Sequence, residues 1–314
     1  MNNFPIERVD SKKKEKFPDV SFNIYFASHY FVADSRKLRL LLDDCDVYVP
    51  EWAEYKPGMQ EFLQRVSNGE ITPDDEAYMN RVPPSFREKL RVLQNSHKIV
   101  ILADVQKGEV EERGGFLGMY LATNAFLRGD FKSALNIARK AVEKIGQIQN
   151  KREGFIRSNL EKKLTELLRG NPKLKEKKLK VLMTMGAGHS TLFQNMQKDG
   201  LEVSREYNAN LEIFSNADEV IRTAQLGKEI EDELLAKAIL ENELSELLPT
   251  WMLDDGQELA RLMRRILDKF NLKDIEDLSK AFGASGGTVD ALYAVLEEKG
   301  INFPRNREEL EKIT

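Results

Sequence analysis

Hydrophobic and polar positions follow two patterns along the first two thirds of the chain. Short runs rich in aromatic, β-branched and aliphatic residues predict buried strands, and the longer segments between them have the three-to-four-residue apolar spacing of helices. The predicted strands cover residues 21–27, 46–49, 98–103 and 180–185, with two shorter candidates at 201–207 and 211–214. Helices are expected at 34–42, between 57 and 96, as two or three segments within 116–168, and from the Gly186–Gly188 turn to about 198.

The last third of the chain shows helical spacing alone. Beyond about residue 217, apolar residues recur at Ile230, Leu234 and Ala238. Further helices are expected at 256–270, 275–281 and 289–298. Repeated strand–helix units followed by such a segment predict an α/β fold with a mostly parallel central sheet, helices on both of its faces and a C-terminal all-helical region. We expect an α/β domain over residues 1–215 and an acidic helical domain over residues 216–314.

Charge is distributed unevenly between these two parts. Of the 52 acidic and 48 basic residues, residues 209–314 hold 23 and 13, so residues 1–208 are net basic. Residues 151–180 contain eleven Lys or Arg against four Glu, without the series of interleaved aromatic residues typical of nucleic-acid-binding surfaces. We interpret this run as a solvent-exposed face and expect no nucleic-acid partner.

The cysteine count and the length of the apolar runs limit the compartment in which we expect the protein. The chain has one cysteine, Cys45, which excludes an intramolecular disulfide and a cysteine-based zinc site. No run approaches the ~20 apolar residues of a membrane span, and the first twenty residues lack the apolar core of a secretory signal. We therefore expect a soluble, cytoplasmic protein with no membrane partner.

Four of the predicted strands are followed by residues that can carry chemistry. His29 and His189 follow the first and fourth long strands, and Glu51 and Asp104 follow the second and third. Ligands bind beyond the carboxyl ends of the strands in an open parallel sheet, so these side chains are expected at one edge. Each alone has a structural alternative, since such residues also cap helices and form turns. Together they can bind a divalent metal or supply an acid and a base. His97 precedes a strand and is interpreted as structural.

Helical geometry adds one basic side chain to this set. The apolar stripe of the helix expected at 151–168 consists of Ile156, Leu160, Leu164 and Leu167. Arg152 lies one turn before that stripe and should point inward. A buried arginine needs an anion, either a structural carboxylate or a substrate group. Arg157 is expected to align with Glu153 and Glu161 on the solvent-exposed face.

Short motifs follow a fixed order along residues 21–208. A helix that begins near Arg152 is followed by a strand and by Gly186-Ala187-Gly188-His189, a Gly-x-x-His (GX2H) motif. An earlier segment, Phe26-Ala27-Ser28-His29, has Phe26 in place of the glycine, and Glu51 ends the next strand. In this order the motifs resemble those of the TraB/Tiki superfamily. The region after residue 217 carries no such resemblance.

The resemblance implies a fold and a class of chemistry. The superfamily includes Tiki metalloproteases, erythromycin esterases, pheromone-shutdown TraB-like proteins and a haem-binding lipoprotein group. It implies an α/β fold in which two histidines and a glutamate form the site of a hydrolase, with a divalent metal in some members.

The leading hypothesis is a hydrolase that cleaves an ester, amide or peptide bond in a small-molecule or peptide substrate. The expected catalytic residues are His29, Glu51, Arg152 and His189. The residues expected to contact the substrate are Arg152, Gly186, Gly188 and Ser190. Where the reaction uses Mn²⁺, Co²⁺ or Zn²⁺, the expected ligands are His29, Glu51, Asp104 and His189. Glu51 is expected to activate water, and Asp104 to bind the metal or to support an imidazole.

The alternative hypothesis is a protein without catalytic activity. It would bind a small ligand or haem, or act as an adaptor through its helical region. The charge imbalance favours docking of the acidic helices on the basic part, either within one chain or in a homodimer.

Overall fold

The structure is a computed structural model of the chain. It describes residues 17, 19–27, 32–53, 55–73, 84–106, 113–186, 188–189, 191–207, 215–247, 263–286, 289–301 and 308–309. The strand expected at 211–214 and the first part of the helix expected at 256–270 lie outside these residues. Within the described part of the chain, no helix combines the length and apolar character needed to span a membrane.

The described strands form a five-stranded sheet in which all neighbours are parallel. The strands are β1 (Val20–Ala27), β2 (Val47–Pro50), β3 (Ile99–Val100), β4 (Leu179–Gly186) and β5 (Glu202–Tyr207), in the order β3-β2-β4-β1-β5. The predicted parallel α/β architecture is therefore confirmed. The strand predicted at 98–103 is shorter than expected, with only Ile99 and Val100 in the ladder, because Pro50 of the neighbouring strand β2 lacks the N–H group that would continue it.

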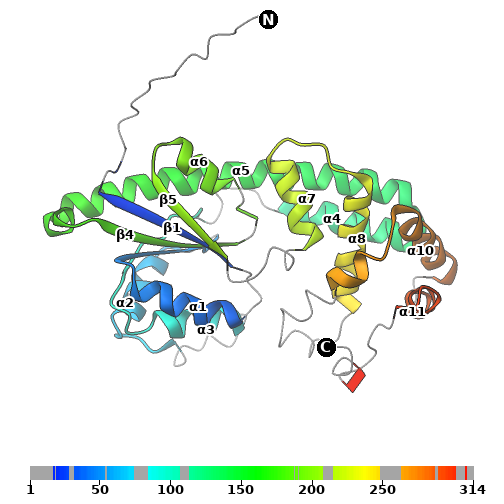
Figure 1. Cartoon of the computed structure of the whole chain (residues 1–314), viewed down its shortest axis with the longest axis horizontal. Helices are drawn as coiled ribbons and strands as arrows, with labels where there is room; N and C mark the ends of the chain where they lie inside the picture. Colours follow the sequence, from blue (N-terminus) through cyan, green and yellow to red (C-terminus); the bar gives the residue numbers. More distant parts are fainter. Residues whose placement is uncertain are drawn as a thin grey trace, which may run out of the picture.

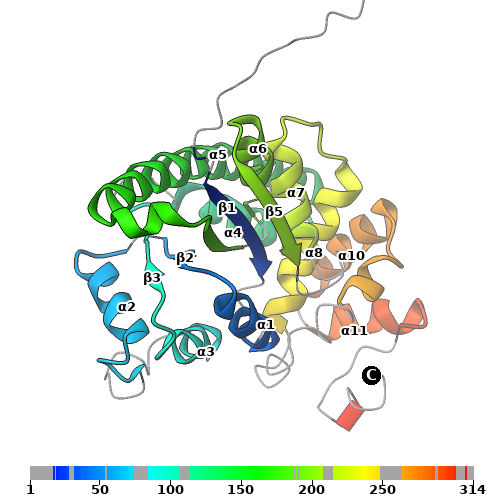
Figure 2. The same cartoon turned by 60° about the vertical axis from the view of Figure 1, so that its left-hand side comes forward.

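Helices cover both faces of this sheet (Figures 1 and 2). The first face packs against α1 (Val32–Asp43), α2 (Met59–Ser67) and α3 (Pro84–Leu93). The second face packs against α6 (Leu192–Lys198) and the later half of α5 (Phe131–Gly170), which is followed by the short helix η3 (Pro172–Glu176). Neighbouring residues of β1 show the alternation, since Ile24 belongs to the core under α5 and Tyr25 to the core under α1–α3.

A second group of helices, called the helical layer below, has a hydrophobic core of its own. The helical layer contains α7 (Asn216–Gln225), α8 (Asp232–Leu247), α10 (Leu272–Ser285) and α11 (Val289–Glu298). Its buried core also includes residues of α4 (Arg113–Leu127) and of the first half of α5, among them Phe126, Ala138 and Val142. The helical layer is therefore not built from residues 216–314 alone.

Helix α5 connects the two parts. Its 40 residues begin after Asp130, whose side chain accepts a hydrogen bond from the backbone N–H of Ser133. The first half of α5 packs in the helical layer, and the second half, with Ile156, Leu160 and Leu164, packs on the sheet. The segment between residues 116 and 168 thus contains two helices rather than three, and α5 runs along both parts of the molecule (Figure 1).

Candidate functional site

The carboxyl ends of three neighbouring strands carry three of the predicted site residues. Glu51 follows β2, Asp104 follows β3 and His189 follows β4, and these strands are adjacent in the sheet. The arrowheads of β1 and β5 in Figure 1 point toward the side on which α7 and α8 lie. His29 and Ser190, also predicted for the site, lie outside the described residues. The last residue of β1, Ala27, pairs in register with Gly186 at the end of β4.

Arg152 points inward, as predicted, and binds both carboxylates of this edge. Its Nε donates to Asp104 Oδ1 at 2.8 Å, and its Nη2 donates to Asp104 Oδ2 at 2.6 Å and to Glu51 Oε1 at 3.0 Å. Asp104 also accepts the backbone N–H groups of Trp52 and Val105. Among the described residues, Asp104 is therefore paired with the guanidinium group, and its expected role beside a metal or an imidazole stays a prediction.

Glu51 links this ion pair to His189. The Oε1 atom of Glu51 lies 3.0 Å from His189 Nε2, and its Oε2 atom accepts the backbone N–H of Gly186. His189 is 1% exposed, and the side chain of Glu51 is 9% exposed. Oε1 of Glu51 thus faces both the guanidinium group of Arg152 and the imidazole of His189. Gly186, predicted to contact the substrate, thus donates to Glu51 in this arrangement.

A second carboxylate lies on the other side of His189. Glu153 Oε1 is 3.8 Å from His189 Nδ1 and accepts a hydrogen bond from Gln225 Nε2 at 3.2 Å, while the hydroxyl of Thr191 donates to Oε2. Glu153 is fully buried, so its predicted place on the solvent-exposed face is wrong. Burial is the main cause that raises the pKa of Glu153, and the nearby His189 opposes it.

Sequence reasoning missed Glu153, Thr191 and Gln225. The available signal was a polar run in the middle of an otherwise amphipathic helix, residues 149–153 of α5. Arg152 and Glu153 from this run are buried, and Asn150 donates to the backbone carbonyl of Gln225 at 3.0 Å. This polar stretch of α5 therefore faces the site and α7.

The described residues do not fit a divalent metal in this arrangement. No group of three or more potential metal ligands occurs among them. The guanidinium of Arg152 lies between Glu51 and Asp104 and uses the oxygens that a metal would need. A dication at this position would also face the positive charge of Arg152 at close range.

The other predicted residues near the sheet have structural surroundings. Phe26 is buried and stacks on Tyr207 with 5.3 Å between the ring centroids. His97 is exposed just before β3, with φ 54°, and its backbone N–H donates to the carbonyl of Ser67. Arg157 pairs with Asp199 of the α6 C-terminus at 2.6 Å, rather than with the predicted Glu153 and Glu161.

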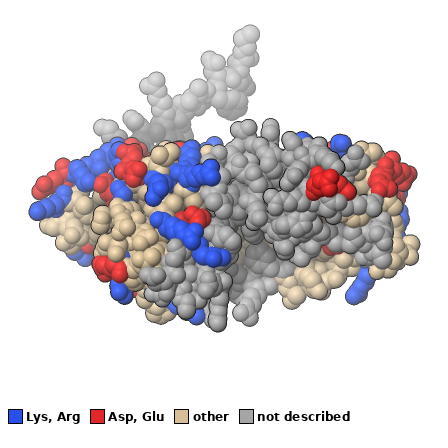
Figure 3. Space-filling model, turned by 90° about the horizontal axis from the view of Figure 1, so that it is seen from below, with Lys and Arg blue, Asp and Glu red and all other residues tan. Residues whose placement is uncertain are grey.

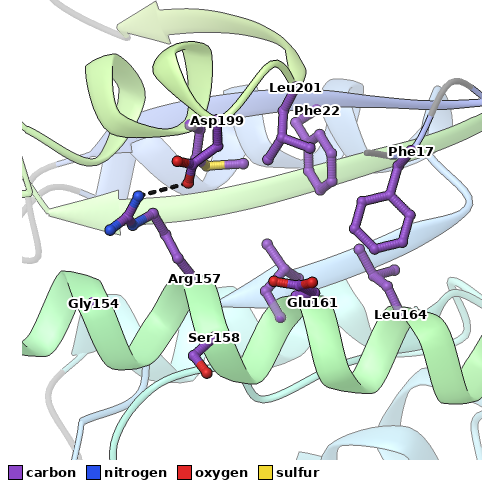
Figure 4. Close-up of a pocket in the computed structure, with 11 residues that line it drawn as sticks. Phe17, Phe22, Gly154, Arg157, Ser158, Glu161, Leu164, Asp199 and Leu201 are labelled. Carbon is purple, nitrogen blue, oxygen red and sulfur yellow. Dashed lines mark hydrogen bonds and ion pairs between the residues drawn. The ribbon is translucent and has the colours of Figure 1, made fainter. Parts of the chain in front are cut away.

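A cavity of about 250 Å³ lies between α5, α6 and the amino end of β1 (Figure 4). Its apolar lining consists of Phe17, Phe22, Leu160, Leu164, Met196 and Leu201. The ion pair of Arg157 and Asp199 spans it from α5 to α6, and Glu161 contributes a carboxylate. This cavity is separate from the charged cluster at the carboxyl edge. A smaller pocket, lined by Trp52, Phe86 and Lys89 among others, lies directly beside Glu51.

Several lysines that follow α5 pair with acidic residues. Lys178 binds Glu202 and Lys180 binds Asp44, each at 2.6 Å, and Lys177 binds Asp46. On the described part of the face in Figure 3, Lys and Arg side chains are likewise interspersed with Asp and Glu. Part of the local basic excess is thus balanced by acids that are distant in the sequence.

Comparison of the chain with protein-family models, with curated proteins and with solved structures finds no match. The resemblance to the TraB/Tiki superfamily therefore stays a prediction, and the arguments below depend on the residues of this chain.

Proposed function

We propose that this protein is a hydrolase that cleaves an ester, amide or peptide bond at the carboxyl edge of the sheet. The observation that carries the proposal is the 3.0 Å contact between Glu51 Oε1 and His189 Nε2, in a buried cluster that also contains Arg152 and Asp104. A carboxylate and an imidazole in contact can exchange a proton, which general acid–base catalysis of hydrolysis needs.

The proposed reaction uses both groups of that contact. Glu51 takes a proton from water while the water oxygen bonds to the carbonyl carbon of the substrate. His189 enters this step as the imidazolium, with a proton on each ring nitrogen, gives its Nε2 proton to the leaving oxygen or nitrogen as the scissile bond breaks, and becomes a neutral imidazole. The proton on Glu51 then returns to Nε2 across the same contact, which restores both groups. The small pocket beside Glu51, lined in part by Trp52 and Phe86, has a volume of about 10 Å³, which is room for about one water molecule, so it supports an approach of the attacking water from this side.

The remaining predicted residues support this chemistry. Arg152 stabilises the charge of Glu51, and we assign to it the binding of an anionic substrate group or of the oxyanion. Asp104 holds Arg152 through two hydrogen bonds. His29, which follows β1 by two residues, is proposed as a second imidazole of the site.

A screen of the full-length protein tests the proposal. Chromogenic esters, anilides and peptides are offered with Mn²⁺, Co²⁺ or Zn²⁺ and with a chelator. We expect His189→Ala and Glu51→Gln each to lower kcat/KM by about 10²–10⁴-fold. The exposed His97 provides the matched control, and His97→Ala should leave the rate unchanged. Turnover that survives both His29→Ala and His189→Ala contradicts the proposal.

A second candidate function is the binding of a small organic ligand without turnover. The cavity of Figure 4 favours it, because an apolar lining with charged groups at its margin suits a small amphipathic molecule. A ligand that binds only the folded state at 100 times its Kd adds about 2.7 kcal/mol to the free energy of unfolding. Thermal unfolding with a library of small amphipathic acids and amines, and with haem, tests this function. Gly154→Leu, which would fill the cavity, should abolish the stabilisation.

A further inference from the structure

Glu153 is a fully buried carboxylate whose described contacts include no lysine or arginine. Its hydrogen bonds come from the neutral donors Thr191 and Gln225. Burial of a carboxylate is costly unless it is hydrogen-bonded and paired with a positive charge. The group available for such a pairing is the imidazole of His189, 3.8 Å away.

One ring nitrogen of His189 also lies buried without a hydrogen bond in the described part of the chain. Its Nε2 contacts Glu51, but its Nδ1 is buried and has no hydrogen-bond partner among the described residues. Glu153 Oε1 is 3.8 Å from Nδ1, about 0.9 Å beyond the usual distance of an N–H···O hydrogen bond. Two buried polar atoms, Nδ1 of His189 and Oε1 of Glu153, thus face each other.

We propose that Glu153 is a positioning residue for His189. It accepts a hydrogen bond from Nδ1–H and thereby keeps a proton on that nitrogen, so that Nε2 is the nitrogen that exchanges its proton with Glu51. The carboxylates that face the imidazole are then Glu51 on one side and Glu153 on the other, with Arg152 held against Glu51. The catalytic value of this arrangement rests on the proposed hydrolase function.

Glu153 also connects the helical layer to the site. Gln225 is the last residue of α7, and its side chain donates to Glu153 at 3.2 Å. The backbone carbonyl of Gln225 accepts from Asn150 of α5 at 3.0 Å. Helix α7 can approach α5 this closely because Gly146 has no side chain at the crossing, where a Cβ atom would lie 2.8 Å from that of Ala224. The helical layer therefore holds Glu153 in place.

Nitrogen NMR of the ¹⁵N-histidine-labelled full-length protein at pH 7 tests this role without any need for turnover. The chain has three histidines, so His189→Gln identifies the signals of His189 by their loss. We expect Nδ1 of His189 to carry a proton in the unmodified protein. Glu153→Gln should shift the Nδ1 resonance toward that of an unprotonated nitrogen. Gln225→Leu, which removes one donor to Glu153, should shift it in the same direction by less.

Glu166→Gln is the matched control, because Glu166 is an exposed glutamate of the same helix. It should leave the His189 signals unchanged. An unprotonated Nδ1 in the unmodified protein overturns the proposal even if Glu153→Gln does not fold. An unchanged spectrum in a folded Glu153→Gln variant overturns it as well. A protein that shows the predicted spectrum but no hydrolysis contradicts only the proposed function.

Discussion

Arg152 and Asp104 form a buried, two-point ion pair between the middle of α5 and the end of β3. Nε and Nη2 of Arg152 bind the two oxygens of Asp104 at 2.8 and 2.6 Å, and the two side chains are 7% and 0% exposed. The pair fixes the long helix to the sheet at the place where the site lies. Because both charges are removed from water, loss of one partner leaves the other uncompensated.

We predict that Asp104→Ala lowers the free energy of unfolding by about 3–5 kcal/mol, the cost typical of breaking a buried ion pair. The control is Asp199→Ala, which removes the exposed partner of Arg157 on the same helix. Its effect should stay within about 1 kcal/mol. Urea denaturation measures both variants, and equal losses would show that Arg152 is not held as the structure indicates.

Two glycines of α5 give opposite predictions for the same substitution. A Cβ at Gly146 would lie 2.8 Å from Ala224 Cβ and 3.1 Å from two backbone atoms of α7, whereas a Cβ at Gly154 would meet nothing within 4 Å. Gly154→Ala should therefore stabilise the protein by about 0.5–1 kcal/mol, the difference in helix propensity. Gly146→Ala should destabilise it by about 1 kcal/mol or more, because overpacking at the crossing outweighs that gain. Thermal unfolding of both variants separates the two effects, and stabilisation by Gly146→Ala would contradict the close contact of α5 and α7.

The sequence allowed part of this site to be predicted. Apolar runs located the strands, and the parallel arrangement brought Glu51, Asp104 and His189 to one edge. The inward direction of Arg152 followed from the stripe that begins at Ile156. The burial of Glu153 could not be predicted in this way, because an apolar stripe identifies only the one face of a helix that packs on a single neighbouring element.

Helix α5 has different partners along its length, and this is the physical reason for the error. Near residue 153 it contacts α7 as well as the sheet, so the residue next to Arg152 is buried too. Gln225, which binds Glu153, is 72 residues away in the sequence, and no local pattern connects the two. The length of β3 was overestimated for another reason, because its apolar run carries no information about Pro50 of the neighbouring strand β2, which has no N–H group to continue the ladder.

The stability of the helical layer should depend on pH through Glu241 of α8. Burial raises the pKa of Glu241 to about 7 from an ordinary value of 4.5, and the negative charge of Asp218 adds to the effect. The folded state therefore binds more protons than the unfolded state between these values, and the free energy of unfolding falls as the pH rises through that window. A shift of this size corresponds to up to about 3 kcal/mol.

Glu241→Gln should remove this pH dependence and stabilise the protein at pH 8, since the amide oxygen can still accept the backbone N–H of Ala217. Urea denaturation between pH 5 and 8 measures the effect. The exposed Glu229, mutated to Gln, is the control and should keep the slope of the unmodified protein. If the free energy of unfolding of Glu241→Gln depends on pH as steeply as that of the unmodified protein, another group causes the dependence.

The fragment of residues 1–215 should not fold as a soluble, cooperative unit. It keeps α4 and α5, but it lacks α7, α8, α10 and α11, which cover the apolar surface of their first halves. Phe126, Ala138 and Val142 are all fully buried in the whole chain, and they would be exposed in the fragment. Exposure of such a contiguous apolar surface favours aggregation. Expression of the fragment beside the full chain, with size-exclusion chromatography and thermal unfolding, measures the outcome. A soluble fragment with a cooperative transition would instead support the domain boundary predicted at residue 215 and show that the helical layer is an independent module.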